Sequence, residues 1–505
     1  MIKRYLNRIR SNSTETNLCW GLFVLYLIVT FVFAVGHVPW RDETQVWLIA
    51  RDLSPAGIFR QMRYEGHPAL LHYLVMPLAK LNLPVVSMCI LNWCFTSGTA
   101  YLILIRSPLK LTLRFFILIS GMMLSAPILL ARNYAVFVFL GALFLTLYPK
   151  REAHPLLLSG VVALLANTHL IGAFLAVGFA LVRGVEFLTD LSRYARRHVL
   201  KTKRETLLKQ LAGLFIMLAG FLLLVLQVGE SLSSNQMIDD SGEPLFSAVL
   251  RLLEKFSANL FGTATSTVSL VLALAFFFFM VISLLRSYKA LLFFLSTNAL
   301  LLYMYSRVYQ KPFDFFLVYF VFAYWLYLIH AEEGLPAGSP PALWRTTDLL
   351  MPLMLCLLLA TGFKNGVYDI DSRLQPQAPA SASKEVGLYL NQPAFHDAVF
   401  VGSQPAYDSP ITAYLDDKKG VWHAADQKFS TFTTWDEAYM SNIGMSIDSI
   451  VDAAYAYFPE DQKIIFIFPN FHKENADQNT RIRLIYSSQI AVNDESYVLY
   501  EAVRE

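Results

Sequence analysis

The sequence predicts a multi-pass α-helical membrane protein that carries an extracytoplasmic α/β domain at its C-terminal end. Of its 505 residues, 55% are hydrophobic and only 16% are charged, whereas soluble domains carry about 25% charged residues. Apolar runs long enough to cross a bilayer recur up to about residue 365, and from residue 385 the composition is that of a soluble domain. We therefore expect about eleven transmembrane helices followed by a polar domain.

Charge and motifs exclude several classes of function. The net charge of +3 is small for the length, which argues against a nucleic-acid partner. The sequence has no G-x-G-x-x-G or P-loop pattern, so nucleotide binding has no support. Its four cysteines form neither a disulfide framework nor a zinc-ligand spacing. The first ten residues, "MIKRYLNRIR", hold four basic residues and no acid, which places the N-terminus in the cytoplasm.

The predicted spans follow from the apolar runs and from the charge of the loops between them. The first run ends before the "GHVPWRDE" segment, which then lies outside. The long run 156–182 has basic flanks at both ends, so we divide it into two short helices that meet at the outer side in "ANTH" (166–169). The remaining runs lie at about 84–105, 115–130, 134–149, 210–229, 267–285, 290–305, 313–330 and 348–363. This count brings the C-terminus to the outer side.

A Pro/Ala/Ser-rich stretch, "LQPQAPASAS", marks the change in composition. We assign residues 1–365 to a transmembrane domain with its first outer loop at 38–83, residues 366–384 to a linker, and residues 385–505 to the α/β domain. In that domain the short apolar stretches "DAVFVG" and "KIIFIFPN" are predicted strands.

Ionisable and aromatic residues gather at the outer ends of the predicted spans. They are Asp42, Glu43, Glu65, His67, Arg132, Tyr134 and His169. Asp42 and Glu43 begin "PWRDETQVWLIARD", which we expect to form a helix in the plane of the membrane interface. Because ionisable groups near the bilayer usually line a cavity, this convergence indicates a polar active-site cleft. The alternatives are acids that only stabilise the helix dipole, and a structural ion-pair network among Arg132, Asp42 and Glu65.

The residue types define the chemistry that such a cleft can perform. A carboxylate can act as general base on an acceptor hydroxyl, and a cation can stabilise a phosphate leaving group. Arg307 and Lys311, in the outer loop "YSRVYQKPFD", fit the second role, although cations that only anchor helices at the interface are the alternative. A divalent metal bound by His67 with Glu65 or His169 and Asp42 is left open, because E-x-H is no established ligand signature.

With these residues in view, the chain resembles the membrane glycosyltransferases of the C superfamily (GT-C), which include protein O-mannosyltransferases and aminoarabinose transferases. The resemblance covers residues 18 to about 365. It rests on the acidic "RDE" after the first span, "YEGHPALLHYL", "ARNYAVFVFLGAL" (131–143) and the extracytoplasmic domain. It implies transfer of a sugar from a polyprenyl-phosphate donor to a lipid, glycan or protein acceptor at the outer face. The acid of the first outer loop is then the catalytic base, for which we favour Asp42 over Glu43.

Two other functions compete with an inverting glycosyltransferase. A transporter or flippase of lipid-linked sugars would use the same cavity without making a bond, but it predicts inverted repeats, which the sequence does not show. A membrane scaffold would leave the function to the soluble domain as a binding module. The one N-x-S/T sequon, at Asn12, lies on the predicted cytoplasmic side, which favours a bacterial inner membrane with the α/β domain in the periplasm or outside the cell. Membrane lipids and the lipid-linked donor are the expected partners.

Overall fold

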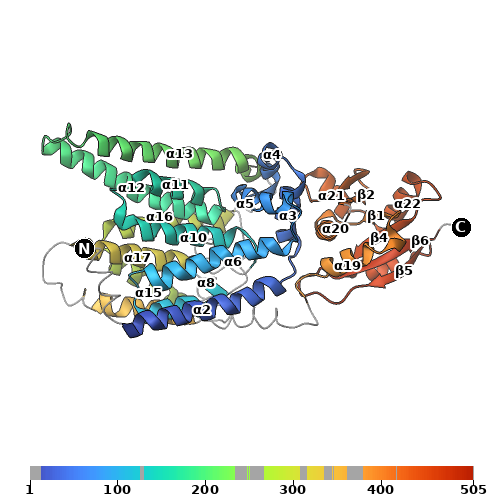
Figure 1. Ribbon diagram of the computed structural model, residues 1–505, viewed down its shortest axis with the longest axis horizontal. Coiled ribbons are helices and arrows are strands. Elements are labelled where there is room, and N and C mark those ends of the chain that lie inside the picture. The colour runs from blue at the N-terminus through green and yellow to red at the C-terminus, as the bar shows by residue number, and fades with distance from the viewer. Residues whose placement is uncertain are drawn as a thin grey trace.

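A bundle of long helices lies at one end of the protein and a mixed sheet at the other (Figure 1). This computed structural model describes residues 13–124, 130–233, 247, 250, 267–307, 315–334, 344, 346–360, 379–416 and 418–503. Three short helices, α3 to α5, lie where the bundle meets the sheet domain (Figure 1). They come from the predicted first outer loop, so this loop forms the junction between the two parts.

The bundle consists of helices that follow the predicted apolar runs. They are α2 (Ser13–Gly36), α6 (Val86–Tyr101) with a π-helical turn η1 (Leu102–Arg106), α7 (Leu111–Ile119), α8 (Gly121–Leu124), α10 (Asn133–Leu147), α11 (Pro155–Ala166), α12 (Leu170–Arg196), α13 (Arg204–Ser233), α15 (Thr267–Leu284), α16 (Tyr288–Arg307), α17 (Phe315–Gly334) and a helix at Thr346–Ala360.

Five helices in the described part of the chain are long and apolar enough to cross a membrane. They are Thr14–Gly36, Val86–Arg106, Asn133–Lys150, Leu170–Arg196 and Arg204–Gly229. Other runs form shorter apolar helices, among them Pro155–Ala166 and Thr346–Ala360. The membrane class is therefore confirmed, while the count of about eleven spans stays a prediction.

The long apolar run at 156–182 is broken where the loop charges predicted it. Helix α11 ends at Ala166 and α12 begins at Leu170. The amide of Asn167 donates to the carbonyls of Ala163 and Gly220, at 2.9 Å each, and His169 Nδ1 accepts from the Ile171 amide at 3.2 Å. Such side-chain bonds satisfy backbone groups outside the helix ladder, and they therefore end one helix and begin the next.

The predicted first outer loop folds into α3 (Arg41–Asp52), α4 (Pro55–Glu65) and α5 (Leu70–Lys80). Ser54 caps α4 by accepting from the Gly57 amide at 3.1 Å, and Gly66, at a φ of 66°, ends it in the left-handed region that glycine favours. Helix α3 buries its apolar side chains and packs against both α5 and the sheet domain. It is therefore a buried junction helix, and its predicted position at the membrane interface stays a prediction.

The C-terminal part contains a six-stranded sheet of order β3-β2-β1-β4-β6-β5. The strands are β1 (Val399–Gly402), β2 (Val421–His423), β3 (Lys428–Ser430), β4 (Ile464–Pro469), β5 (Ile482–Ser487) and β6 (Tyr497–Ala502). Strand β1 pairs in parallel with β2 and β4, and the other pairs are antiparallel. The two strands predicted from "DAVFVG" and "KIIFIFPN" are the adjacent central strands β1 and β4.

Helices cover both faces of this sheet, as expected for an α/β domain. They are α19 (Ser383–Leu390), α20 (Pro405–Thr412), α21 (Glu437–Ile443), α22 (Ile447–Tyr457) and α23 (Lys473–Asp477). Ile450 and Val451 of α22 belong to one apolar core, and Val386 of α19 and Ile411 of α20 belong to another. The last two residues of the predicted linker 366–384 already belong to α19, and 361–378 lie outside the described residues.

Hydrogen bonds join the sheet domain to α3. The Arg41 amide donates to Glu495 Oε1 at 2.8 Å. The amide group of Gln45 forms a two-way pair with the Thr433 backbone, donating to its carbonyl at 2.6 Å and accepting from its N–H at 3.0 Å. Asp42 and Glu43 lie between Arg41 and Gln45 in sequence. The helix that carries the two acids is therefore the same helix to which the sheet domain is bonded.

Candidate active site

Asp42 and Glu43 both lie in the first turn of α3, but their side chains have different surroundings. Glu43 is fully buried. Its Oε2 bonds His37 Nε2 at 2.7 Å and accepts from the Trp40 amide at 3.1 Å, while Oε1 accepts from the Ala131 amide at 2.6 Å. Burial raises the pKa of Glu43, but His37 and these amides more than offset it, so the pKa lies below its ordinary value. Glu43 therefore ties α3 to the segment before α10.

Asp42 keeps access to solvent and pairs with a cation. Its side chain is 34% exposed, and Arg132 Nη1 donates to its Oδ2. Arg132 directly precedes α10, and its guanidinium lies 5.8 Å from the centre of the Tyr134 ring. In this pair of adjacent acids, Asp42 is thus the carboxylate with access to solvent.

Glu65 is the last residue of α4, and its carboxylate is bonded to Gln45 of α3. Its Oε1 accepts from Gln45 Nε2 at 2.9 Å and from Gln61 Nε2 at 3.2 Å. Burial raises the pKa of Glu65 to about 7, against the effect of these two hydrogen bonds. Gln45 therefore contacts both the candidate site, through Glu65, and the sheet domain, through Thr433.

The raised pKa of Glu65 predicts a pH-dependent stability. Between its ordinary pKa of 4.5 and about 7, the folded protein holds a proton at Glu65 that the unfolded chain has released, so stability declines as pH rises through this window. Glu65→Gln stays neutral and keeps an acceptor for Gln45 and Gln61. We expect its melting temperature, measured on the purified full chain, to decline less than that of wild type between pH 5 and 7.5. Identical slopes for the two proteins would contradict the burial of an ionisable Glu65.

The remaining residues that the sequence predicted at the outer face meet around the Arg132 guanidinium. Its charge acts on Glu65, His67, His72, Tyr134 and His169. The rings of Tyr134 and His169 lie 5.4 Å apart, and those of His67 and His72 stack at 5.5 Å. Burial, followed by the charge of Arg132, lowers the pKa of His67 to about 4. Residues from α3, α4, α5, α10 and the α11–α12 break thus form one polar cluster at the end of the bundle beside the sheet domain.

A glutamine from α13 holds two parts of this cluster together. Gln227 Oε1 accepts from the Ala69 amide, and Gln227 Nε2 donates to Asn167 Oδ1, both at 2.9 Å. The loop that carries His67 is therefore bonded to the helix break that carries His169. The sequence prediction did not include Gln227, His37, Gln45 or His72. A polar side chain inside the apolar run 210–229 was the available signal for Gln227.

The two predicted phosphate-binding cations are not placed by the described residues. Arg307 is the last residue of α16, but its side chain and the whole of Lys311 lie outside the described part. Among the described residues, no group of three or more His, Cys, Asp or Glu side chains is arranged to hold a metal ion. The metal left open by the sequence therefore gains no support from this geometry.

A second charged cluster lies at the opposite end of the bundle. Glu186 bonds Lys289 at 2.6 Å and Arg151 at 3.0 Å, and Arg183 also pairs with it. Tyr148 donates to the same carboxylate at 2.5 Å. Because three cations surround one buried carboxylate, the cluster has the properties of a structural network that fastens α10, α12 and α16 together.

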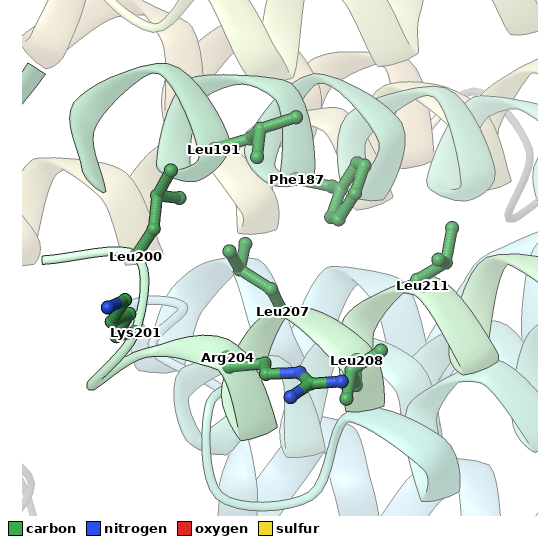
Figure 2. Close-up of a pocket in the computed structure, with 8 residues that line it drawn as sticks. All are labelled: Phe187, Leu191, Leu200, Lys201, Arg204, Leu207, Leu208 and Leu211. Atoms are coloured by element: carbon green, nitrogen blue, oxygen red, sulfur yellow. The ribbon is translucent and has the colours of Figure 1, made fainter. Parts of the chain in front are cut away.

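An apolar pocket near the same end of the bundle is lined mainly by leucine side chains and holds no acid or histidine. It lies between α12 and α13, and Figure 2 shows leucine and phenylalanine side chains around it, with Lys201 and Arg204 at one side. The connection from α12 to α13 is far from the sheet domain (Figure 1). None of the residues that line this pocket belongs to the polar cluster around Arg132.

Comparison with known proteins shows the fold. No family model and no curated protein sequence matches the chain. Two solved structures of ArnT from Cupriavidus metallidurans, one bound to undecaprenyl phosphate and one in the apo state, are similar to it. Each match covers 97% of this chain and 98% of ArnT, at a TM-score of 0.54 and 11% sequence identity. The predicted resemblance to the aminoarabinose transferases is thus confirmed at the level of the fold.

Proposed function

We propose that this integral membrane protein is a glycosyltransferase that moves a sugar from a polyprenyl-phosphate donor to an acceptor hydroxyl at the outer face of the membrane. The observation that carries the proposal is the position of Asp42. It is the more exposed of the two adjacent acids of the first outer loop, it pairs with Arg132, and its helix α3 lies where the helix bundle meets the sheet domain (Figure 1). The similarity to an ArnT structure bound to undecaprenyl phosphate supports the donor class.

In the proposed reaction Asp42 acts as general base. Its carboxylate takes the proton of the acceptor hydroxyl, whose oxygen attacks the anomeric carbon of the donor sugar. The bond from that carbon to the phosphate oxygen breaks, so the products are the glycosylated acceptor with inverted configuration and the polyprenyl phosphate. Arg132 orients the Asp42 carboxylate until the acceptor binds. Arg307 and Lys311 are proposed to hold the leaving phosphate.

The proposed setting is a bacterial inner membrane. The N-terminus then lies in the cytoplasm, and the sheet domain with residues 385–505 lies in the periplasm or outside the cell. Because the sheet domain contacts α3 directly, we propose that it helps to bring a lipid, glycan or protein acceptor to Asp42.

Mass spectrometry of membrane lipids and surface glycans tests the function in cells that lack the protein. We expect one glycan or lipid to lose the mass of one sugar, and the wild-type gene to restore it. A second assay uses the purified protein in vesicles that carry the sugar donor of these cells. A transferase releases polyprenyl phosphate and forms product, whereas a flippase moves the donor and forms neither. Restoration of the glycan by a fragment of residues 384–505 alone would instead support the scaffold alternative.

A further inference from the structure

His72 is a buried polar residue whose ring nitrogens have no hydrogen-bond partner among the residues that the structure describes. It lies on α5, and its side chain is completely buried. Within the described part of the chain, neither Nδ1 nor Nε2 has a hydrogen-bond partner. His67, whose ring stacks on that of His72 at 5.5 Å, also has a buried Nδ1 without a partner there. Buried polar atoms of this kind are destabilising unless a ligand or water satisfies them.

The position of these rings connects them to the proposed site. Arg132, the partner of Asp42, acts electrostatically on both imidazoles. His67 also feels the charge of Asp42. The loop between the two histidines is held in place by the bond from the Ala69 amide to Gln227. Three ring nitrogens without a partner in the described part of the chain thus belong to the polar cluster around Arg132, which also pairs with the proposed catalytic base.

We propose that His67 and His72 bind the hydroxyl groups of an uncharged donor sugar. The inference rests on the proposed function and names the substrate class of the same site. A neutral imidazole offers one donor and one acceptor, which matches hydroxyl groups that both donate and accept. Burial lowers the pKa of both histidines, so the rings are neutral at physiological pH and suit this role.

The charges nearby favour a sugar without an amine over a cationic one. The positive charge of Arg132 lowers the pKa of both histidines. It would therefore repel an ammonium group placed beside their rings. The carboxylates around the cluster already have partners. Glu43 accepts from His37, Trp40 and Ala131, and Glu65 accepts from two glutamines. Asp42 is paired with Arg132.

The test compares wild type with His72→Leu, an apolar side chain of similar volume that suits a helix. Three properties are measured on the full chain: sugar transfer in the complementation assay, the melting temperature, and the rise in melting temperature caused by undecaprenyl phosphate, a probe that carries no sugar. We expect transfer to fall by at least about 100-fold, because the substrate hydroxyls lose their partner. We expect the melting temperature to stay the same or rise, and the response to undecaprenyl phosphate to match that of wild type.

His330→Leu is the matched control for stability. His330 is also buried, but its ring nitrogens bond Tyr148 at 3.0 Å and Ser287 at 2.8 Å. The same substitution should therefore lower the melting temperature there. If His72→Leu lowers it equally, His72 is structural and the inference is wrong.

Other outcomes separate this inference from the proposed function. Transfer by His72→Leu at the wild-type rate, or loss of its response to undecaprenyl phosphate, would overturn the assignment of a sugar-binding residue. A missing sugar that carries a free amine would overturn the uncharged class. If wild type transfers no sugar, the proposed function fails and the inference fails with it.

Discussion

Replacement of Asp42 by Asn is expected to reduce sugar transfer by about 10²–10⁴-fold, the range that a general base contributes. Asparagine keeps the shape of the side chain but cannot take a proton from the acceptor hydroxyl. The fold should survive, because the side chain is 34% exposed and the amide oxygen can still accept from Arg132. The measurement is restoration of the surface glycan in cells lacking the protein, with the amount of membrane-inserted protein measured in parallel.

Asp52→Asn is the matched control for this prediction. Asp52 lies in the last turn of the same helix, where it bonds Arg51 at 2.7 Å and Thr431 at 2.5 Å, and it is not part of the cluster around Arg132. We expect near wild-type transfer from this variant. Full restoration of the glycan by Asp42→Asn would show that the carboxylate is structural, and it would favour the transporter or scaffold function.

The large features of the fold were predictable because they depend on local composition. Hydropathy marks the helices of the bundle, and the basic flanks of 156–182 indicated that this run is divided, which is why the break before Leu170 was predicted. The short apolar stretches near 399 and 464 predicted β1 and β4 in the same way. The order of the six strands was not predicted, because it depends on contacts between segments far apart in sequence.

The candidate site was only partly predictable for the same reason. Polar residues at the outer ends of apolar runs indicated which segments meet, and Asp42 and Arg132 do meet. The sequence could not separate Asp42 from Glu43, since the difference arises from the Ala131 amide, 88 positions away. His72 was missed because it lies within an apolar stretch, where a single histidine is indistinguishable from a partnered core residue. Its unbonded nitrogens become visible only in three dimensions.

Glu43→Gln is expected to destabilise the protein, whereas Asp42→Asn is not. The Glu43 carboxylate accepts hydrogen bonds from His37 and from the backbone amides of Trp40 and Ala131. The glutamine side chain is neutral, and its NH2 group would face at least one of these N–H donors. Removing one partner of a buried hydrogen bond costs about 1–3 kcal/mol, and more where a charge is involved. The measurement is the thermal unfolding of the purified full chain. Glu205→Gln is the control, because water screens the exposed pair of Glu205 with Lys209 and its loss should leave the melting temperature nearly unchanged.

The pH dependence gives this prediction a second readout. Because the pKa of Glu43 is lowered in the folded state, its stabilising contribution is present above its ordinary value of 4.5 and is lost as pH falls below that value. Wild type and Glu43→Gln should therefore differ most at neutral pH and converge under acid conditions. Molecules of Glu43→Gln that remain folded should still transfer sugar within about tenfold of wild type, since Asp42 is unchanged. A stable Glu43→Gln protein without transfer would reverse the assignment and make Glu43 the base.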